Sequence, residues 1–164
     1  MRFHLIDRID ALDPHRSVTA RKLTSRQEEF WRDEGRGPEM PAPLVLEALC
    51  QAGTWLIMGS TGLRRRAALL SADSVSFQGA VRPGDVLVMS GRVESFGDDT
   101  AVLSGRVTVG DRTVLTADAI MCALIPTEDL EDPQDVRRMY DRLTRGATIT
   151  GATITGGALK EAVA

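Results

Sequence analysis

Residues 41–59 read PAPLVLEALCQAGTWLIMG and contain the longest apolar stretch of the chain. The two prolines at the start fit the first turn of a helix, where their missing N–H groups would have no partner. From Leu44 onward, apolar residues occupy nearly every face of the helix that this pattern predicts. A helix that is apolar on all sides is buried within its domain. We therefore expect one central, buried helix over residues 44–59.

Stretches with the alternating pattern of strands lie on both sides of this helix. Residues 3–9 and 17–23 precede it, with a turn near Asp13-Pro14, and residues 27–39 form a charged loop that contains Gly35 and Gly37. The strands expected after the helix are residues 74–77, 86–93, 100–109 and 113–125. One buried helix followed by long antiparallel strands predicts an α+β fold in which a curved antiparallel sheet wraps around a central helix.

The C-terminal part of the chain differs from this pattern. Asp132-Pro133 is expected to cap a short amphipathic helix at the surface, over residues 134–143. Residues 146–150 and 151–155 then repeat the sequence GATIT. Such small residues bury little surface, so we predict a domain over residues 1–145 and a flexible tail over 146–164. Pairing of the tail along a sheet edge is the alternative.

Composition narrows the classes of function. With 164 residues, 43% hydrophobic and 26% charged, the chain has the content of one ordinary globular domain. A net charge of −3 argues against nucleic-acid binding, and two histidines without Cys-x-x-Cys argue against a metal site. Glu47, Gln51 and Thr54 interrupt the apolar stretch, which is too short to cross a bilayer. The first residues lack an apolar signal core, and Cys50 and Cys122 look like buried free thiols, so we expect a cytoplasmic protein.

Glu47 is the residue most suggestive of chemistry. It lies one turn inside the apolar helix, with Gln51 one turn further along the same face. Burial of a carboxylate is costly unless the group is hydrogen-bonded, and it favours the raised pKa that a general acid or base needs near neutral pH. The alternative is a structural glutamate that interacts favourably with the helix N-terminus and a local hydrogen-bond network.

Residues 38–51 resemble the bacterial 3-hydroxyacyl-[acyl-carrier-protein] dehydratases, in which His-Phe-Pro-x-x-Pro-x-x-Pro-Gly precedes an apolar helix with Glu-Ala-x-x-Gln. Residues 3–8 resemble the family's opening Phe-Leu-Leu-x-Asp-Arg, and residues 77–85 resemble its Phe-x-x-x-Val-x-Pro-Gly-Asp turn. The resemblance covers residues 3–125 and implies a hotdog fold. It also implies a substrate carried on the phosphopantetheine of acyl-carrier protein, no further cofactor, and a dimer with active sites at the subunit interface.

The family's catalytic pair is the histidine of His-Phe-Pro and the helix glutamate. Glu47 matches the glutamate, whereas Asp33-Glu34-Gly35 stands where the histidine is expected, so Asp33 is a weaker candidate base. His4 and His15 belong to the N-terminal segment, and His4 is expected to be a core or edge residue. The family's motif glycine is replaced by Ala42. The resemblance suggests five substrate-binding residues: Gln51, Pro41, Ala42, Phe77 and Trp55.

Four arginines are candidates for docking the acidic carrier protein: Arg64, Arg65, Arg66 and Arg82. A basic cluster after the central helix would steer such a partner electrostatically. The alternative is that these charges complement the C-terminal end of the helix dipole and remain solvated.

Three functions fit the sequence. In the first, favoured here, the chain is a dehydratase-like subunit that contributes Glu47 to a site shared with a related, histidine-bearing partner, in fatty-acid or polyketide synthesis. In the second, it is an acyl-thioester hydrolase in which Asp33 and Glu47 orient a water. In the third, it binds acyl thioesters as a scaffold without catalysis. Homodimers and heterodimers both remain open.

Overall fold

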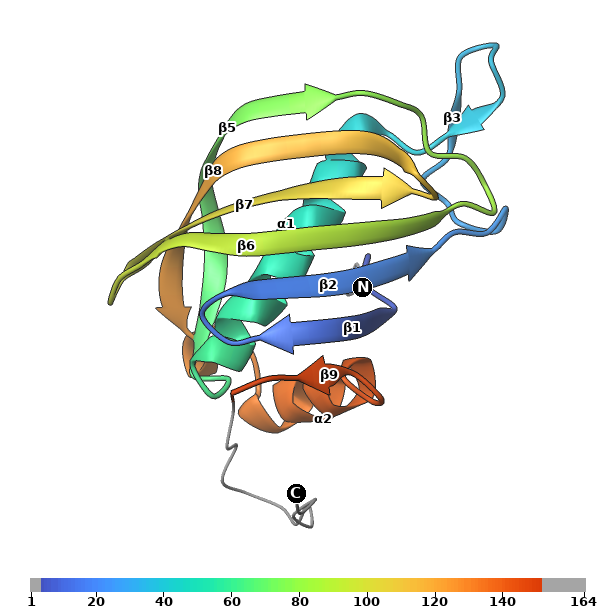
Figure 1. Cartoon of the computed structure of the whole chain (residues 1–164). Helices are drawn as coiled ribbons and strands as arrows, with labels where there is room; N and C mark the ends of the chain where they lie inside the picture. Colours follow the sequence, from blue (N-terminus) through green and yellow to red (C-terminus); the bar gives the residue numbers. More distant parts are fainter. Residues whose placement is uncertain (1–3, 152–164) are drawn as a thin grey trace, which may run out of the picture.

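The computed structural model describes residues 4–151, in which a long helix, α1 (Ala42–Ser60), lies inside a strongly curved sheet (Figure 1). The sheet has seven strands in the order β5-β8-β7-β6-β2-β1-β9. Their bounds are β1 (Arg8–Asp13), β2 (Ser17–Leu23), β5 (Arg65–Phe77), β6 (Val86–Phe96), β7 (Thr100–Val109), β8 (Arg112–Pro126) and β9 (Thr148–Ile149). All neighbours pair antiparallel except β9, which runs parallel to β1. This arrangement confirms the expected α+β hotdog fold.

Small residues allow the sheet to approach α1 closely. A Cβ atom on Gly53 would lie 2.7 Å from Leu103 Cδ1. One on Gly105 would lie 2.6 Å from the carbonyl oxygen of Ser90 and 2.8 Å from Leu49 Cδ1. Glycine at these positions removes the side chain that would otherwise push the helix out of the sheet. The close contact buries the apolar faces that the sequence pattern predicts.

The apolar stretch was expected to be too short to cross a bilayer, but by length and composition alone the 19-residue α1 is long and apolar enough to do so. It is instead the helix around which the sheet curves, and half of its apolar window is buried there. Core helices of this kind have the same composition as a membrane span.

Several strand boundaries match the predictions, while those of the first strand and of β5 do not: β5 starts at Arg65, nine residues before the expected strand over residues 74–77. β2 coincides with the expected strand, and the turns between β6, β7 and β8 lie where they were expected. The first strand starts at Arg8, because the N–H of Leu5 donates to Gln51 Oε1 (2.8 Å) and is not used in the sheet. The expected loop over residues 27–39 contains a small hairpin, β3 (Arg32–Asp33) and β4 (Pro38–Glu39).

The chain after β8 covers one end of α1. A short 3-10 turn, η1 (Thr127–Asp129), leads into α2 (Pro133–Leu143), whose first turn is capped by Asp132 accepting from the Gln134 N–H at 2.7 Å. Val136, Tyr140 and Leu143 are buried, so α2 is amphipathic, as expected. β9, from the first GATIT repeat, extends the sheet at β1. The remainder of the predicted tail, residues 152–164, lies outside the described residues.

Candidate functional site at the Glu47 cavity

Glu47 lines a cavity of about 270 Å³ beside α1. Four parts of the chain form its walls: α1, the N-terminal segment, the start of β5 and the segment after β8. The lining residues are His4, Glu47, Cys50, Gln51, Thr54, Trp55, Met58, Arg66, Leu69, Glu131, Val136 and Met139. Charged and apolar side chains from these four parts of the chain thus line one cavity.

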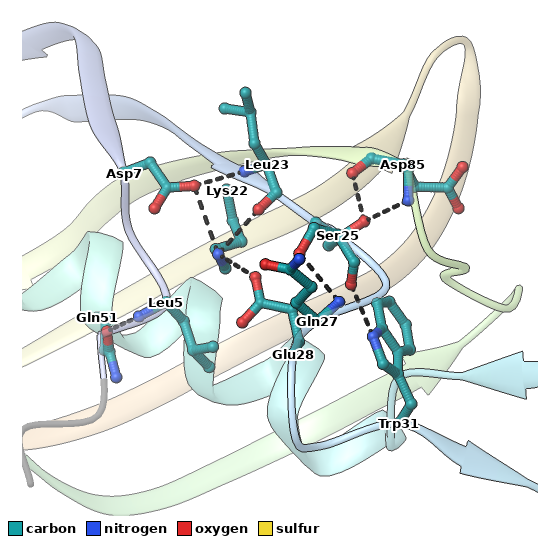
Figure 2. A network of polar contacts seen from close by, with 12 residues as sticks. Leu5, Asp7, Lys22, Leu23, Ser25, Gln27, Glu28, Trp31, Gln51 and Asp85 are labelled. Carbon is teal, nitrogen blue, oxygen red and sulfur yellow. Dashed lines mark hydrogen bonds and ion pairs between the residues drawn. The ribbon is translucent and has the colours of Figure 1, made fainter.

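A hydrogen-bond chain orients the Glu47 carboxylate. The Gln51 amide donates from Nε2 to Glu47 Oε1 at 2.9 Å, one helical turn away. The other end of the same amide accepts from the Leu5 N–H, as the dashed line in Figure 2 marks. Because both ends of the amide are engaged, the direction in which Gln51 donates is fixed. The structure thus brings the predicted residues Gln51 and Trp55 together with Glu47.

His4 also lines this cavity, although it was expected to be a core or edge residue. It is an exposed residue of the segment that precedes β1. The Leu5–Gln51 hydrogen bond holds this segment against α1, and the neighbouring His4 lines the cavity that Glu47 lines. The position of this segment depends on the contact between Leu5 and Gln51, which lie 46 positions apart in the sequence. A carboxylate and an imidazole therefore line one cavity, and both are side chains that serve as general acids or bases in enzymes.

Cys50 reports on the environment of Glu47. Burial, then the negative charge of Glu47 and, more weakly, that of Cys122 together raise the pKa of its thiol from 9.0 to about 11. A thiol with so high a pKa is neutral at physiological pH and is a poor nucleophile. Cys50 therefore lines the cavity as an apolar group.

The three consecutive arginines separate in the structure. Arg66 forms an ion pair with Glu131 and lines the Glu47 cavity. Arg65 donates to the carbonyl oxygen of Leu124 at 3.1 Å, and Arg64 Nε donates to the carbonyl oxygen of Thr61 at 3.0 Å. Arg65 and Arg66 are consecutive residues of β5, so their side chains point to opposite faces of the sheet. Arg64 precedes the strand.

A second, larger cavity of about 830 Å³ lies at the other end of β5. Three predicted substrate residues line it, Pro41, Ala42 and Phe77, together with the predicted docking residue Arg82. Arg82 donates to Glu39 Oε1 and to the carbonyl oxygen of Arg36, both at 2.8 Å. Within one chain, the predicted substrate-binding residues are therefore divided between two cavities, whereas Asp33, Arg64 and Arg65 line neither of them.

Asp33 lies in the β3–β4 hairpin and shapes its turn. Its Oδ1 accepts from the N–H groups of Gly35 (2.8 Å) and Gly37 (3.0 Å). It is exposed, and it lines neither the Glu47 cavity nor the larger cavity. Within a single chain the two carboxylates therefore do not share a site.

A buried lysine fixes the loop that carries this hairpin, as Figure 2 shows. Lys22 Nζ contacts Glu28 Oε1 at 2.8 Å and Asp7 Oδ2 at 3.5 Å, and Trp31 Nε1 donates to the carbonyl oxygen of Ser25 at 2.8 Å. Burial of the lysine is tolerable because it is paired with carboxylates. The network joins the N-terminal segment, β2 and the loop into one unit.

Among residues 4–151, no three His, Cys, Asp or Glu side chains gather as ligands for a metal ion.

Comparison with known proteins assigns the family. A family model described as a FabA-like domain matches residues 1–118. The chain belongs to the FabA-like family. Among its curated relatives is a 3-hydroxyacyl-[acyl-carrier-protein] dehydratase FabZ of Lactobacillus helveticus (strain DPC 4571), which is 33% identical over 115 residues, or 69% of this chain and 78% of the relative. The chain is thus a distant relative of the FabZ dehydratases within the FabA-like family.

Solved structures share the hotdog fold at lower identity. The smu.793 protein from Streptococcus mutans UA159, bound to acetyl CoA, matches with a TM-score of 0.59 and 17% identity over 77% of this chain and 93% of that chain. The dehydratase heterocomplex ApeI:P from Xenorhabdus doucetiae matches with a TM-score of 0.59 and 14% identity over 83% of this chain and 88% of that chain. At these identities the likeness shows the fold alone.

Proposed function

We propose that the chain is a dehydratase-like subunit that acts on 3-hydroxyacyl thioesters carried by acyl-carrier protein, in fatty-acid or polyketide synthesis. A base removes the α-proton, the 3-hydroxyl group leaves as water after protonation by Glu47, and an enoyl thioester remains. The observation that carries the proposal is the Glu47 carboxylate, oriented by Gln51 inside a cavity of a FabA-like chain. A positioned carboxylic acid of this kind accelerates proton transfer to a leaving hydroxyl.

The free edge of β5 supports a shared active site. β5 ends the sheet and has no partner strand on its outer side among the described strands, although it is 13 residues long. Leu69 and Leu70 on it are 52% and 58% exposed. Long, apolar edge strands pair with other chains, and a two-fold axis pairs two copies antiparallel. We therefore place the dimer interface at β5.

Such pairing would bring the two cavities together. Arg66 and Leu69, near the start of β5, line the Glu47 cavity, whereas Phe77, at its end, lines the larger cavity. In an antiparallel pair the start of one β5 lies beside the end of the other. The Glu47 cavity of one subunit would then adjoin the hairpin loop of its partner, where the family resemblance places the catalytic histidine.

In this chain that loop offers Asp33, which is exposed. A related subunit with a histidine in this loop would complete the site as a heterodimer. The ApeI:P complex, which is a dehydratase heterocomplex of the same fold, provides a precedent for two-chain assembly.

His4 favours a second arrangement of the same reaction. It lines the cavity with Glu47 in the same chain, so its imidazole would take the place of the missing family histidine and make the subunit self-sufficient. Hydrolysis by two carboxylates has less support, because Asp33 and Glu47 line no common cavity within one chain.

Carrier-protein docking is proposed at the larger cavity. Arg32, Arg36 and Arg82 line it and would attract an acidic partner or the phosphate of its prosthetic group. Arg66 is paired with Glu131 as Arg82 is with Glu39, so the choice of the larger cavity rests on the additional arginines Arg32 and Arg36 that line it.

A dehydration assay with 3-hydroxyacyl-carrier protein separates the two arrangements. The purified chain is measured alone, as the variant His4→Gln, and together with a co-expressed histidine-bearing relative. Turnover only in the presence of the relative supports the heterodimer, while turnover by the chain alone that is lost in His4→Gln supports the self-sufficient site. Release of free thiol in place of water loss would overturn both and support the hydrolase.

A further inference from the structure

The segment after β8 supplies part of the Glu47 cavity wall. Glu131, Val136 and Met139 line the cavity, and all three lie beyond residues 1–118, which the FabA-like model matches. This part of the cavity is therefore an addition to the matched family domain.

The face of α1 that lines the cavity is polar at one end and apolar at the other. Glu47, Gln51, Trp55 and Met58 lie at spacings of four, four and three residues, which places them on one face of α1. Helix geometry puts Glu47 and Met58 about 16 Å apart along the axis. Glu47 and Gln51 form the polar part of this face, Trp55 and Met58 form its apolar end toward the C-terminus of α1, and the Arg66–Glu131 ion pair also lines the cavity.

α2 is positioned at the apolar end. The rings of Trp55 and Tyr140 are 6.2 Å apart, and a Cβ atom on Gly59 would lie 3.4 Å from the Tyr140 hydroxyl. Met139, the neighbour of Tyr140, lines the cavity opposite α1. The side chains that close this end are therefore Trp55 and Met58 from α1 and Val136 and Met139 from α2.

Contacts on both sides of the cavity fix this wall. The Thr127 N–H donates to the carbonyl oxygen of Arg64 at 2.9 Å, and Glu131 is paired with Arg66. Val136, Tyr140 and Leu143 anchor α2 in the core. The wall is thus a built part of the fold and does not depend on a flexible segment.

We propose that α2 limits the length of the acyl chain, with Met139 as the residue that determines specificity. The inference rests on the proposed function, because it assumes that the thioester carbonyl and 3-hydroxyl group lie near Glu47. The acyl tail then points along α1 toward Met139. At about 270 Å³, the cavity is slightly below the range of roughly 300–1,000 Å³ that is usual for small-molecule sites, so the subunit selects short acyl chains.

Binding of acyl pantetheine amides of increasing chain length tests the proposal. These analogues contain neither a 3-hydroxyl group nor a thioester, so binding is measured without turnover by calorimetry on the full-length protein. Affinity in the wild type rises with chain length and then falls where the tail meets α2. In Met139→Ala this maximum moves to longer chains, with a gain of about fourfold for each extra methylene that the opened space buries.

Two further variants keep the test decisive. Met139→Trp moves the maximum to shorter chains, and Asp141→Ala, an exposed change on the same helix, leaves the profile unchanged. Identical chain-length profiles in wild type, Met139→Ala and Met139→Trp, all folded by thermal melting, overturn the inference. Absence of dehydration by the wild type both alone and together with the histidine-bearing relative, with the profile still shifted by Met139 variants, overturns the proposed function and leaves the length limit standing.

Discussion

At the scale of single residues, the orientation of Glu47 depends on a side chain that is itself held from a distant part of the sequence. Gln51 donates to Glu47 and accepts from the Leu5 N–H. A carboxylate directed in this way loses little conformational freedom when it meets a substrate. Gln51 is therefore a positioning residue, and Glu47 is the group that we expect to reach the reacting hydroxyl.

Cys50 offers a chemical measure of the Glu47 charge. With a pKa of about 11, its thiolate fraction at pH 8 is about 100-fold below that of a thiol with a pKa of 9.0, so alkylation is slow until the pH approaches 11. Glu47→Gln removes a negative charge that raises this pKa, and we expect faster alkylation at pH 8. Iodoacetamide labelling followed by mass spectrometry measures the rate.

Cys50→Ser is the control that shows which part of the labelling belongs to Cys50. The other cysteine, Cys122, is buried. An unchanged alkylation rate in Glu47→Gln would mean that the charge does not act on Cys50.

The sequence predicted part of the candidate site. Glu47 and Gln51 stand one turn apart in a single helix, so local geometry is enough to pair them. His4 could not be assigned, because its position follows from the contact between Leu5 and Gln51, and the first residues lie outside the β1 ladder. Val136 and Met139 were expected on a surface helix, and only tertiary packing shows that their face lines a cavity.

At the scale of elements, predictions succeeded where a local pattern decides the structure. The apolar run gave α1 within two residues at its start, and alternation gave β2 without error. Two-residue elements such as β3, β4 and β9 have no detectable periodicity and depend on tertiary pairing. β9 pairs with β1 at the edge of the sheet. Such pairing of the tail along a sheet edge was the less favoured alternative.

Gly105 tests the close packing between α1 and the sheet. Gly105→Ala places a Cβ against the Ser90 carbonyl oxygen and Leu49, and we expect a loss of about 1–3 kcal/mol in the free energy of unfolding. Gly97→Ala is the control, because its Cβ meets nothing closer than 3.4 Å. Chemical denaturation measures both. Equal stability of the two variants would mean that the sheet can move away from the helix without cost.

At the scale of the whole molecule, β5 links the two cavities and ends the sheet. The Glu47 cavity borders its beginning and the arginine-lined cavity borders its end. In a single chain these two cavities lie at opposite ends of β5. In an antiparallel dimer, the Glu47 cavity of one subunit would lie beside the larger cavity of its partner. The division of the predicted residues between two cavities is what a site shared between subunits would produce.

Leu70 tests the β5 interface. Leu70→Lys introduces a charge on the exposed edge, and we expect a dimer to become a monomer in sedimentation analysis. Leu23→Lys is a matched control, because Leu23 is similarly exposed (56%, against 58% for Leu70) but lies on β2. Dissociation by both variants, or by neither, would place the interface elsewhere.

The most direct test of the central claim is the rate of water loss from 3-hydroxyacyl-carrier protein, followed by mass, for the wild type and Glu47→Gln. Both are measured in the assembly that supports turnover, with the oligomeric state matched. We predict that Glu47→Gln lowers the rate by roughly 10²–10⁴-fold, as expected for removal of a general acid. An unchanged rate would show that Glu47 is a structural residue of α1 and that the dehydration site lies elsewhere.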